Sequence, residues 1–241
     1  MIIKNKKVKI KIPKKIWYAP YKFEAYGDEE IAAVVQSLNS GWLGGQGPKS
    51  KEFEKRVAKL FGKAYGVFVN SGSSACLLAL ASLNLNKGSQ IITPACTFST
   101  TVSPILQLGF KPVFVDVGLN DYVGDVEQIL EAVNGMTSAI MLPNLIGNKP
   151  DWIKLKIGLQ AMDRNDIYLI EDSADTITKT LKTDVSTTSF YASHIITAGG
   201  IGGMVMFNDK KHVVSSLQYR DWGRLGDDSE ILDDRLSLIH I

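Results

Sequence analysis

The stretch Asn70-Ser71-Gly72-Ser73-Ser74-Ala75 decides how this sequence is interpreted. It follows a short apolar run at residues 65–69, which has the length of a buried strand, and it leads into a helix-length apolar segment at residues 74–83. A strand, a glycine-containing turn and a helix in this order are typical of a parallel α/β sheet, in which ligands bind where strands end and helices begin. The sequence therefore predicts an α/β fold with a candidate ligand site at this turn.

The same alternation of short apolar runs and helix-length segments continues on both sides of this stretch. Strands are predicted at residues 65–69, 90–93, 112–116, 138–142, 167–171, 187–190 and 204–207. Helices are predicted at residues 74–83, 100–108, 126–133, 152–162 and 210–220, and two amphipathic helices precede them at residues 31–38 and 53–61. Strands joined by helix-length segments pair in parallel through right-handed crossovers, so we expect a mostly parallel sheet with helices on both faces.

The composition narrows the classes of function. Of the 241 residues 45% are hydrophobic, which is enough for a large core, and a net charge of +2 gives no electrostatic reason to expect a nucleic-acid partner. No window has the roughly 20 apolar residues needed to span a bilayer. The two cysteines, Cys76 and Cys96, provide neither a disulfide framework nor a metal-binding spacing. We therefore expect a soluble cytoplasmic protein with no metal and no membrane partner.

The turn after the first strand has the features of a phosphate-binding site. Gly72 lets the backbone approach a ligand closely, and the free N–H groups of Ser73 and Ser74 would face an anion at the start of the helix. This arrangement suits a phosphate monoester. A serine is also an ordinary helix N-cap, so a purely structural role stays open here.

Two further strand ends carry candidate ligand-binding residues. Phe98 follows the second strand, where an aromatic ring could stack on a flat heterocycle or could belong to the core. Residues 170–175 place Glu171, Asp172 and Asp175 at the end of another strand. A carboxylate there could keep the ring nitrogen of pyridoxal phosphate protonated, with about 4 kcal/mol of attraction at roughly 4 Å and an effective dielectric near 20. The alternative is a helix N-cap with solvated acids.

A polar segment at residues 186–197 leads into Ala198-Gly199-Gly200-Ile201-Gly202-Gly203. These glycines are similar to a dinucleotide fingerprint, but residues 204–207 read as a strand, and such a fingerprint has to open a helix. His194 lies in the polar segment, and a lone histidine is commonly structural.

The phosphate-binding turn, the aromatic residue, the carboxylate and a polar hairpin occur in this order at strand ends. With these features the sequence resembles the DegT/DnrJ/EryC1/StrS family of sugar aminotransferases and their dehydratase relatives. The resemblance runs from about Tyr26 to Arg224. The resembling segments are residues 40–43 (SGWL), 70–75 (NSGSSA), 97–98 (TF), 112–117 (PVFVDV), 171–172 (ED) and 189–190 (SF). The resemblance implies the large domain of a fold type I pyridoxal-phosphate-dependent transferase, similar to aspartate aminotransferase.

The resemblance also implies roles for individual residues. Backbone N–H groups of Gly72 and Ser73 would bind the cofactor phosphate, with the Ser189 hydroxyl in support. Phe98 would stack on the ring, and Asp172 would pair with its nitrogen. Asp175 stands where the aminotransferases usually have glutamine. The residues assigned to the cofactor are Gly72, Ser73, Phe98, Asp172, Asp175 and Ser189.

His194 occupies the position at which the family carries its Schiff-base lysine, five residues after the serine that Ser189 matches. An imidazole cannot form a Schiff base, so pyridoxal 5'-phosphate or pyridoxamine 5'-phosphate is expected to bind non-covalently. Histidine can still transfer protons near neutral pH, which makes His194 the candidate catalytic residue. This arrangement resembles the 3-dehydratases and 3-dehydrases of nucleotide-linked 4-keto-6-deoxyhexoses. Residues 145–148, 189–194 and 220–224 also resemble segments of the dehydratases.

The resemblance therefore implies an enzyme of deoxysugar biosynthesis, serving lipopolysaccharide or another polysaccharide, that removes the C3 hydroxyl of a nucleotide-linked sugar. Glutamate is a candidate amino donor, and the family implies a homodimer. Two alternatives stay open: a sugar aminotransferase whose lysine role has been lost or has moved to Lys179 or Lys182, and a catalytically silent cofactor-binding homologue.

The sequence also departs from the family pattern. The glycine turn after Thr197 lacks the usual glutamate, and Cys76 and Cys96 cannot supply the cysteine set of the iron–sulfur dehydrases. Relatives continue into a small C-terminal domain, so the chain is expected to be truncated, with a partly non-native end. The expected division is an N-terminal arm at residues 1–25, the cofactor-binding large domain at 26–224 and a truncated C-terminal region at 225–241.

Overall fold

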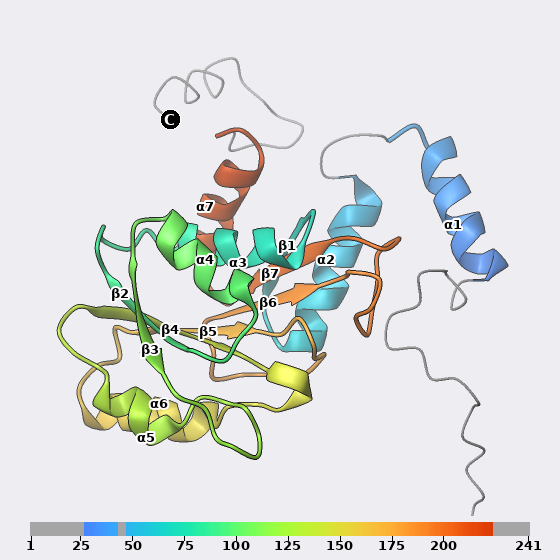
Figure 1. The fold of residues 1–241 in the computed structure, drawn as a ribbon. Coiled ribbons are helices and arrows are strands. Elements are labelled where there is room, and N and C mark those ends of the chain that lie inside the picture. Colours follow the sequence, from blue (N-terminus) through green and yellow to red (C-terminus); the bar gives the residue numbers. More distant parts are fainter. Residues whose placement is uncertain (1–26, 43–46, 224–241) are drawn as a thin grey trace, which may run out of the picture.

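A computed structural model describes residues 27–42 and 47–223 (Figure 1). The expected N-terminal arm, the expected C-terminal region and both boundaries of the expected large domain lie outside the described residues. Residue 43, the last residue of the resembling segment 40–43, also lies outside the described residues.

The described residues form a seven-stranded sheet with the order β1-β7-β6-β5-β4-β2-β3. The strands are β1 (Tyr65–Val69), β2 (Gln90–Pro94), β3 (Lys111–Val115), β4 (Thr137–Pro143), β5 (Tyr168–Asp172), β6 (Val185–Ser189) and β7 (Gly203–Phe207). All neighbouring strands pair in parallel except β7, which is antiparallel to both β1 and β6. No helix lies between β6 and β7, so the chain returns antiparallel beside β6 rather than through a crossover. The expected mostly parallel sheet is confirmed.

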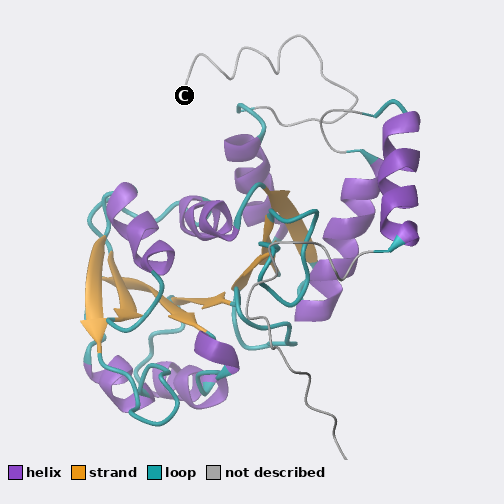
Figure 2. Ribbon diagram, turned by 45° about the vertical axis from the view of Figure 1, so that its right-hand side comes forward, coloured by secondary structure: helices purple, strands orange, loops and turns teal. Residues whose placement is uncertain are grey.

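Helices cover both faces of this sheet (Figure 2). They are α1 (Asp28–Asn39), α2 (Pro48–Phe61), α3 (Gly72–Ala81), α4 (Ser99–Gln107), α5 (Val126–Glu131), α6 (Trp152–Ala161) and α7 (Lys210–Arg220), with a 3-10 turn η1 (Leu145–Gly147). Because side chains alternate along a strand, Ile170 of β5 packs in the cluster with α3, whereas Leu169 packs in the cluster with α6. The helices α3, α4 and α7 thus cover one face, and α2, α5 and α6 cover the other.

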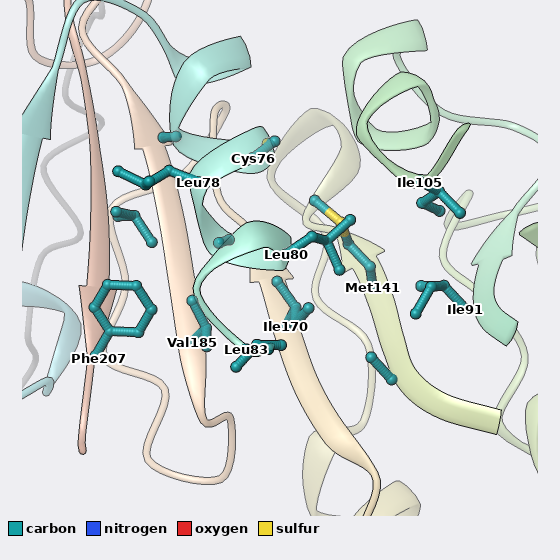
Figure 3. Close-up of a cluster of buried hydrophobic side chains, with 14 of the residues drawn as sticks. Cys76, Leu78, Leu80, Leu83, Ile91, Ile105, Met141, Ile170, Val185 and Phe207 are labelled. Carbon is teal, nitrogen blue, oxygen red and sulfur yellow. The ribbon is translucent and has the colours of Figure 1, made fainter. Parts of the chain in front are cut away.

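The largest core cluster lies between the sheet and α3. Figure 3 shows Leu80 of α3 and Ile105 of α4 above Met141, Ile170 and other strand residues. These four named side chains are fully buried. Their burial fixes α3 against the sheet, and the first turn of α3 is thereby fixed beside the ends of the strands.

The beginning of β6 differs from the prediction. The sequence predicts a strand at residues 187–190, whereas β6 spans Val185–Ser189 and every one of its residues is buried. The strand contains four hydroxyl side chains, so it lacks the apolar pattern by which buried strands are recognised. Its polar groups are satisfied internally: Ser186 Oγ donates to Glu171 Oε2 at 2.7 Å, and Thr188 Oγ1 donates to the carbonyl of Ser173 at 3.0 Å.

Helix α1 lies beyond α2 at the side of the molecule (Figure 1), and none of its residues is buried. Its apolar side chains recur at helical spacing and are 49–61% exposed: Ile31, Val34, Val35 and Leu38. Among the helices of the described residues, none combines the length and the apolar composition that crossing a bilayer requires.

Candidate active site

The candidate residues lie along one edge of the sheet. The carboxyl ends of β1, β5 and β6 meet there because these strands run in the same direction, and β7 begins there because it runs the opposite way. Asp172 ends β5 and Ser189 ends β6. Gly72 begins α3, and only Asn70 and Ser71 separate it from the end of β1. The structure therefore brings residues that are more than 100 positions apart to one edge, as the sequence predicts.

The first turn of α3 leaves two backbone donors available. Ser71 is the N-cap, and its Oγ accepts the N–H of Ser74 at 3.1 Å, so the prediction that Ser74 faces an anion is wrong. The backbone N–H groups of Gly72 and Ser73 precede the first intrahelical hydrogen bond and have no partner within the helix. These two donors, together with the helix dipole, lie where the sequence predicts an anion site.

Ser189 lies directly against this turn. A Cβ added at Gly72 would lie 2.7 Å from the Ser189 Cβ and 3.2 Å from its Oγ, so only glycine fits beside it. Gly203, which pairs with Ser189 in the sheet, also lies close to the turn: a Cβ added there would lie 2.1 Å from the carbonyl oxygen of Ser71. Both glycines are therefore required by close packing, which holds the Ser189 hydroxyl and the two free N–H groups in one place.

Asp172 is a buried carboxyl group on the face of the sheet that α3 and α4 cover. Its Oδ2 accepts the Thr101 hydroxyl at 2.8 Å, and its Oδ1 accepts the Ala174 N–H at 3.3 Å and the Thr187 hydroxyl at 3.4 Å. Burial raises the pKa of Asp172, and the hydrogen bonds oppose that effect only in part. No cation in the described part of the chain is among the interactions that act on this pKa. The site thus holds a buried acid that lacks a positive partner.

Phe98 is 70% exposed, so the alternative that it belongs to the core is wrong. It is the residue before α4 and has an extended backbone (φ −70°, ψ 142°). The adjacent Thr97 donates its hydroxyl to Thr101 at 3.0 Å, and Thr101 contacts Asp172. The turn that carries Phe98 is thereby tied to the buried acid, and the phenyl ring remains available to a ligand.

His194 lies in the connection between β6 and β7 and faces Asp175. The distance from His194 Nε2 to Asp175 Oδ1 is 3.8 Å, and the two side chains are 22% and 40% exposed. The His194 Nδ1 atom is buried and has no hydrogen-bond partner in the described residues. Its backbone N–H donates to the Tyr191 carbonyl at 2.9 Å. The imidazole therefore has a carboxylate neighbour and an unpaired buried nitrogen rather than a hydrocarbon environment.

Asp175 also contacts a strained turn. Its Oδ2 accepts the N–H of Ile146 at 3.4 Å, and Ile146 has a φ of +49°, which is a rare conformation for a β-branched residue. The residues after Asp175 form no helix, so the alternative of a helix N-cap for this acidic segment is wrong.

The alternative lysines lie near the opposite edge of the sheet. Lys179 packs over Gly62, just before β1 begins. Lys182 lies between Thr180 and Thr183, whose carbonyl groups accept hydrogen bonds from the buried Lys63 Nζ at 2.6 and 2.8 Å. The chain in this region is therefore held at the start of β1, away from Asp172 at the other end of β5. Neither lysine is brought to the candidate site.

The structure also shows a supporting ion pair that the sequence did not reveal. Arg220 at the end of α7 donates to Glu54 of α2 at 3.0 Å and to the Phe68 carbonyl of β1 at 3.2 Å. Glu54 also accepts the Phe68 N–H at 2.8 Å, and burial raises the pKa of Glu54. These contacts fix the last residues of β1 immediately before the anion site. The two Arg220 contacts join residues 152 and 166 positions apart, so no local pattern indicates them.

Comparison with protein-family models finds a match to the DegT/DnrJ/EryC1/StrS aminotransferase family over residues 24–235. The chain is 33% identical over 221 residues to a GDP-4-keto-6-deoxy-D-mannose 3-dehydratase of Escherichia coli O55:H7, covering 85% of this chain and 55% of that protein. It is 37% identical to a dTDP-4-dehydro-2,6-dideoxy-D-glucose 3-dehydratase of Saccharopolyspora spinosa, covering 82% and 45%. The chain thus spans about half the length of these relatives.

Solved structures give the same picture. A GDP-4-keto-6-deoxymannose-3-dehydratase variant with bound GDP-perosamine superimposes with a TM-score of 0.78 at 29% identity, covering 88% of this chain and 60% of that one. The E. coli GDP-4-keto-6-deoxy-D-mannose-3-dehydratase with hydrated pyridoxal phosphate gives a TM-score of 0.72 at 32% identity, covering 84% and 53%. These neighbours confirm the fold type I architecture.

Proposed function

Because the chain belongs to the DegT/DnrJ/EryC1/StrS aminotransferase family, we propose that it is the cofactor-binding part of an enzyme that removes the C3 hydroxyl of a nucleotide-linked 4-keto-6-deoxyhexose. The cofactor is pyridoxal 5'-phosphate or pyridoxamine 5'-phosphate, held without a covalent bond. The observation that carries the proposal is the presence of His194, facing Asp175, at the position of the Schiff-base lysine.

The residues at the site fit this cofactor. Asp172 is a buried acid with no cation beside it among the described residues, and a protonated ring nitrogen would supply that cation. The N–H groups of Gly72 and Ser73 suit a phosphate dianion at a helix N-terminus, and Ser189 lies against the same turn. An exposed aromatic ring, Phe98, is available to stack on a flat heterocycle.

In the proposed mechanism these residues bind and orient, and His194 moves the proton. Gly72, Ser73 and Ser189 bind the phosphate, while Asp172 keeps the ring nitrogen protonated. When bound, the amine form of the cofactor would supply the two electrons that expel the C3 hydroxyl of the sugar, and glutamate would then restore the amine form as amino donor. The His194 imidazole would take the proton that the cofactor gives up and pass it to the departing hydroxyl, which leaves as water. Asp175 lies 3.8 Å from His194 Nε2 and would orient the imidazole.

The activity itself can be tested with the chain as it stands. We expect incubation with pyridoxamine 5'-phosphate, glutamate and a GDP- or dTDP-linked 4-keto-6-deoxyhexose to give a sugar without its C3 oxygen, detected by mass spectrometry. A 4-amino sugar as the product would instead show an aminotransferase. Cofactor binding with no change in any of these sugars would contradict the proposal and identify the silent homologue. The His194→Gln variant is the control, because it retains the site but cannot transfer the proton.

We further propose that the protein is a homodimer that works in the cytoplasm, where it would meet nucleotide-linked sugars. The support within the chain is α1, whose apolar face is exposed on this single chain. We expect sedimentation equilibrium to give twice the chain mass at micromolar concentration, and Leu38→Asp to shift the protein to monomers. The matched control is Gln36→Asp, on the same helix but outside this face. A monomeric wild-type protein would contradict the dimer.

A further inference from the structure

Two threonines that have no assigned role form a chain of hydroxyl groups behind Asp172. Thr97 Oγ1 donates to Thr101 Oγ1 at 3.0 Å, and Thr101 Oγ1 donates to Asp172 Oδ2 at 2.8 Å. Thr101 is fully buried at the first turn of α4, and Asp172 is buried at the end of β5. The chain runs from the turn that carries Phe98 to the carboxyl group that the ring nitrogen would meet.

The two oxygens of Asp172 are held unequally. Oδ2 accepts one bond from Thr101 at 2.8 Å, the usual length of a hydroxyl hydrogen bond to oxygen. Oδ1 receives two longer contacts, 3.3 Å from the Ala174 N–H and 3.4 Å from the Thr187 hydroxyl, and the Cys76 thiol also donates to the carboxyl group. Each carboxylate oxygen has two acceptor positions, so Oδ2 has one position left and Oδ1 holds its two contacts only weakly. The carboxyl group can therefore accept a further strong donor.

We propose, on the basis of the proposed function, that Thr101 is a positioning residue that orients the Asp172 carboxyl group and keeps it ionised toward the cofactor's ring nitrogen. Thr97 contributes by donating to the Thr101 oxygen, which directs the Thr101 hydrogen to Asp172. Hydrogen bonds in such a series reinforce one another, so the bond to Oδ2 is stronger than an isolated hydroxyl would make it.

The burial of Asp172 explains why a hydrogen bond from Thr101 is needed. Burial raises the pKa of Asp172 and so favours its neutral form, which cannot hold a pyridinium. The titratable group that faces Asp172 from α3 is Cys76, and burial raises the pKa of that thiol well above its ordinary value, so it remains neutral. From α4 and β6 the carboxyl group is met by the hydroxyls of Thr101 and Thr187. The shortest of these contacts is the Thr101 bond, so its removal should move the proton from the ring nitrogen to Asp172.

The test uses pyridoxamine 5'-phosphate labelled with ¹⁵N in its ring, bound to the whole chain. In the wild-type protein the ring nitrogen is expected to give the ¹⁵N resonance of a pyridinium at neutral pH. Thr101→Val keeps the shape of the side chain and removes the hydroxyl. We expect about a tenfold shift of the proton equilibrium toward a neutral ring in this variant. Thr101→Ser should restore the wild-type resonance, and Thr100→Val, the adjacent substitution on α4, should leave it unchanged.

A Thr101→Val spectrum that superimposes on the wild-type spectrum, with the labelled cofactor bound to both, would overturn the role of Thr101. Thr97→Val provides a second variant in case Thr101→Val does not fold, and it should shift the resonance in the same direction by a smaller amount. If the wild-type protein binds no pyridoxamine 5'-phosphate, the proposed function fails, and the role of Thr101 is then tested without cofactor.

That second readout is the pH dependence of unfolding by urea. The raised pKa of Asp172 means that the folded protein loses stability as the pH rises from the ordinary value of 3.8 through the folded-state value. Removal of the Thr101 hydroxyl raises the folded-state pKa further, so this loss should continue to a higher pH in Thr101→Val. Urea midpoints that follow the same pH course in both proteins would exclude an effect of Thr101 on the ionisation of Asp172.

Discussion

Replacing His194 by lysine is expected to change the protein from one that releases its cofactor into one that holds it covalently. Borohydride treatment of the wild-type protein with pyridoxal 5'-phosphate should leave the intact mass unchanged. The same treatment of His194→Lys should add one reduced cofactor per chain. The reason is chemical: a primary amine at this position can form a Schiff base, and an imidazole cannot. Intact-mass spectrometry and peptide mapping measure the result.

Asp175 should limit this conversion. It lies 3.8 Å from His194 Nε2, so its carboxylate should also lie near an amine at position 194 and stabilise the charged, unreactive form. The double variant His194→Lys/Asp175→Gln carries glutamine at position 175, as the aminotransferases usually do. At neutral pH a larger fraction of it should acquire the reduced cofactor than of the single variant. His194→Gln is the control without an amine. Labelling of Lys179 or Lys182 in the wild-type protein would contradict the assignment of position 194.

The sequence predicted the positions of most strand ends well because most of the strands are short apolar runs next to a turn. The ends of β1, β5 and β6 could therefore be assigned to one edge of the sheet before any coordinates were considered. This predicted Gly72, Asp172 and Ser189 at one edge, and the structure places all three residues there. The sequence did not give the correct bounds of β6, because the four hydroxyl side chains of that strand hide its burial.

The partners of the site residues were beyond sequence reasoning for a different reason. Thr101 and Asp172 are 71 positions apart, and Lys63 and Thr180 are 117 positions apart, so their pairing depends on how the helices pack on the sheet. The Ser71 cap illustrates the opposite case. Its pattern is local, and a serine three residues before Ser74 is a sufficient signal that the Ser74 N–H is already used. Local capping is therefore predictable, whereas buried polar partners are not.

Replacing Asp172 by asparagine is expected to weaken cofactor binding and, at the same time, to stabilise the protein without cofactor. An asparagine keeps the shape of the side chain but cannot form an ion pair with the ring nitrogen. Loss of an attraction of about 4 kcal/mol should weaken the binding of pyridoxamine 5'-phosphate by roughly 100- to 1000-fold. Fluorescence titration or calorimetry of the two proteins measures the change.

The stabilisation follows from the direction of the pKa shift. Burial raises the pKa of Asp172, so its contribution to stability is complete below the ordinary value of 3.8 and is lost as the pH rises through the folded-state value. A buried carboxylate without a cationic partner is costly in the folded state, and Asp172→Asn removes this ionisable group. The urea midpoint of the variant should therefore exceed that of the wild type at pH 7, and the difference should disappear in acid.

Asp166 provides the control, because its pKa is shifted in the opposite direction to that of Asp172. It is exposed, and its hydrogen bond to Arg164 lowers its pKa, so its contribution is present at neutral pH and is lost in acid. Asp166→Asn should leave cofactor affinity unchanged and should not raise the urea midpoint at pH 7. If Asp172→Asn binds the cofactor as tightly as the wild type, the acid is not the partner of the ring nitrogen. A gain in stability together with a loss of affinity would show that the fold tolerates the cost of this charge because the ligand requires it.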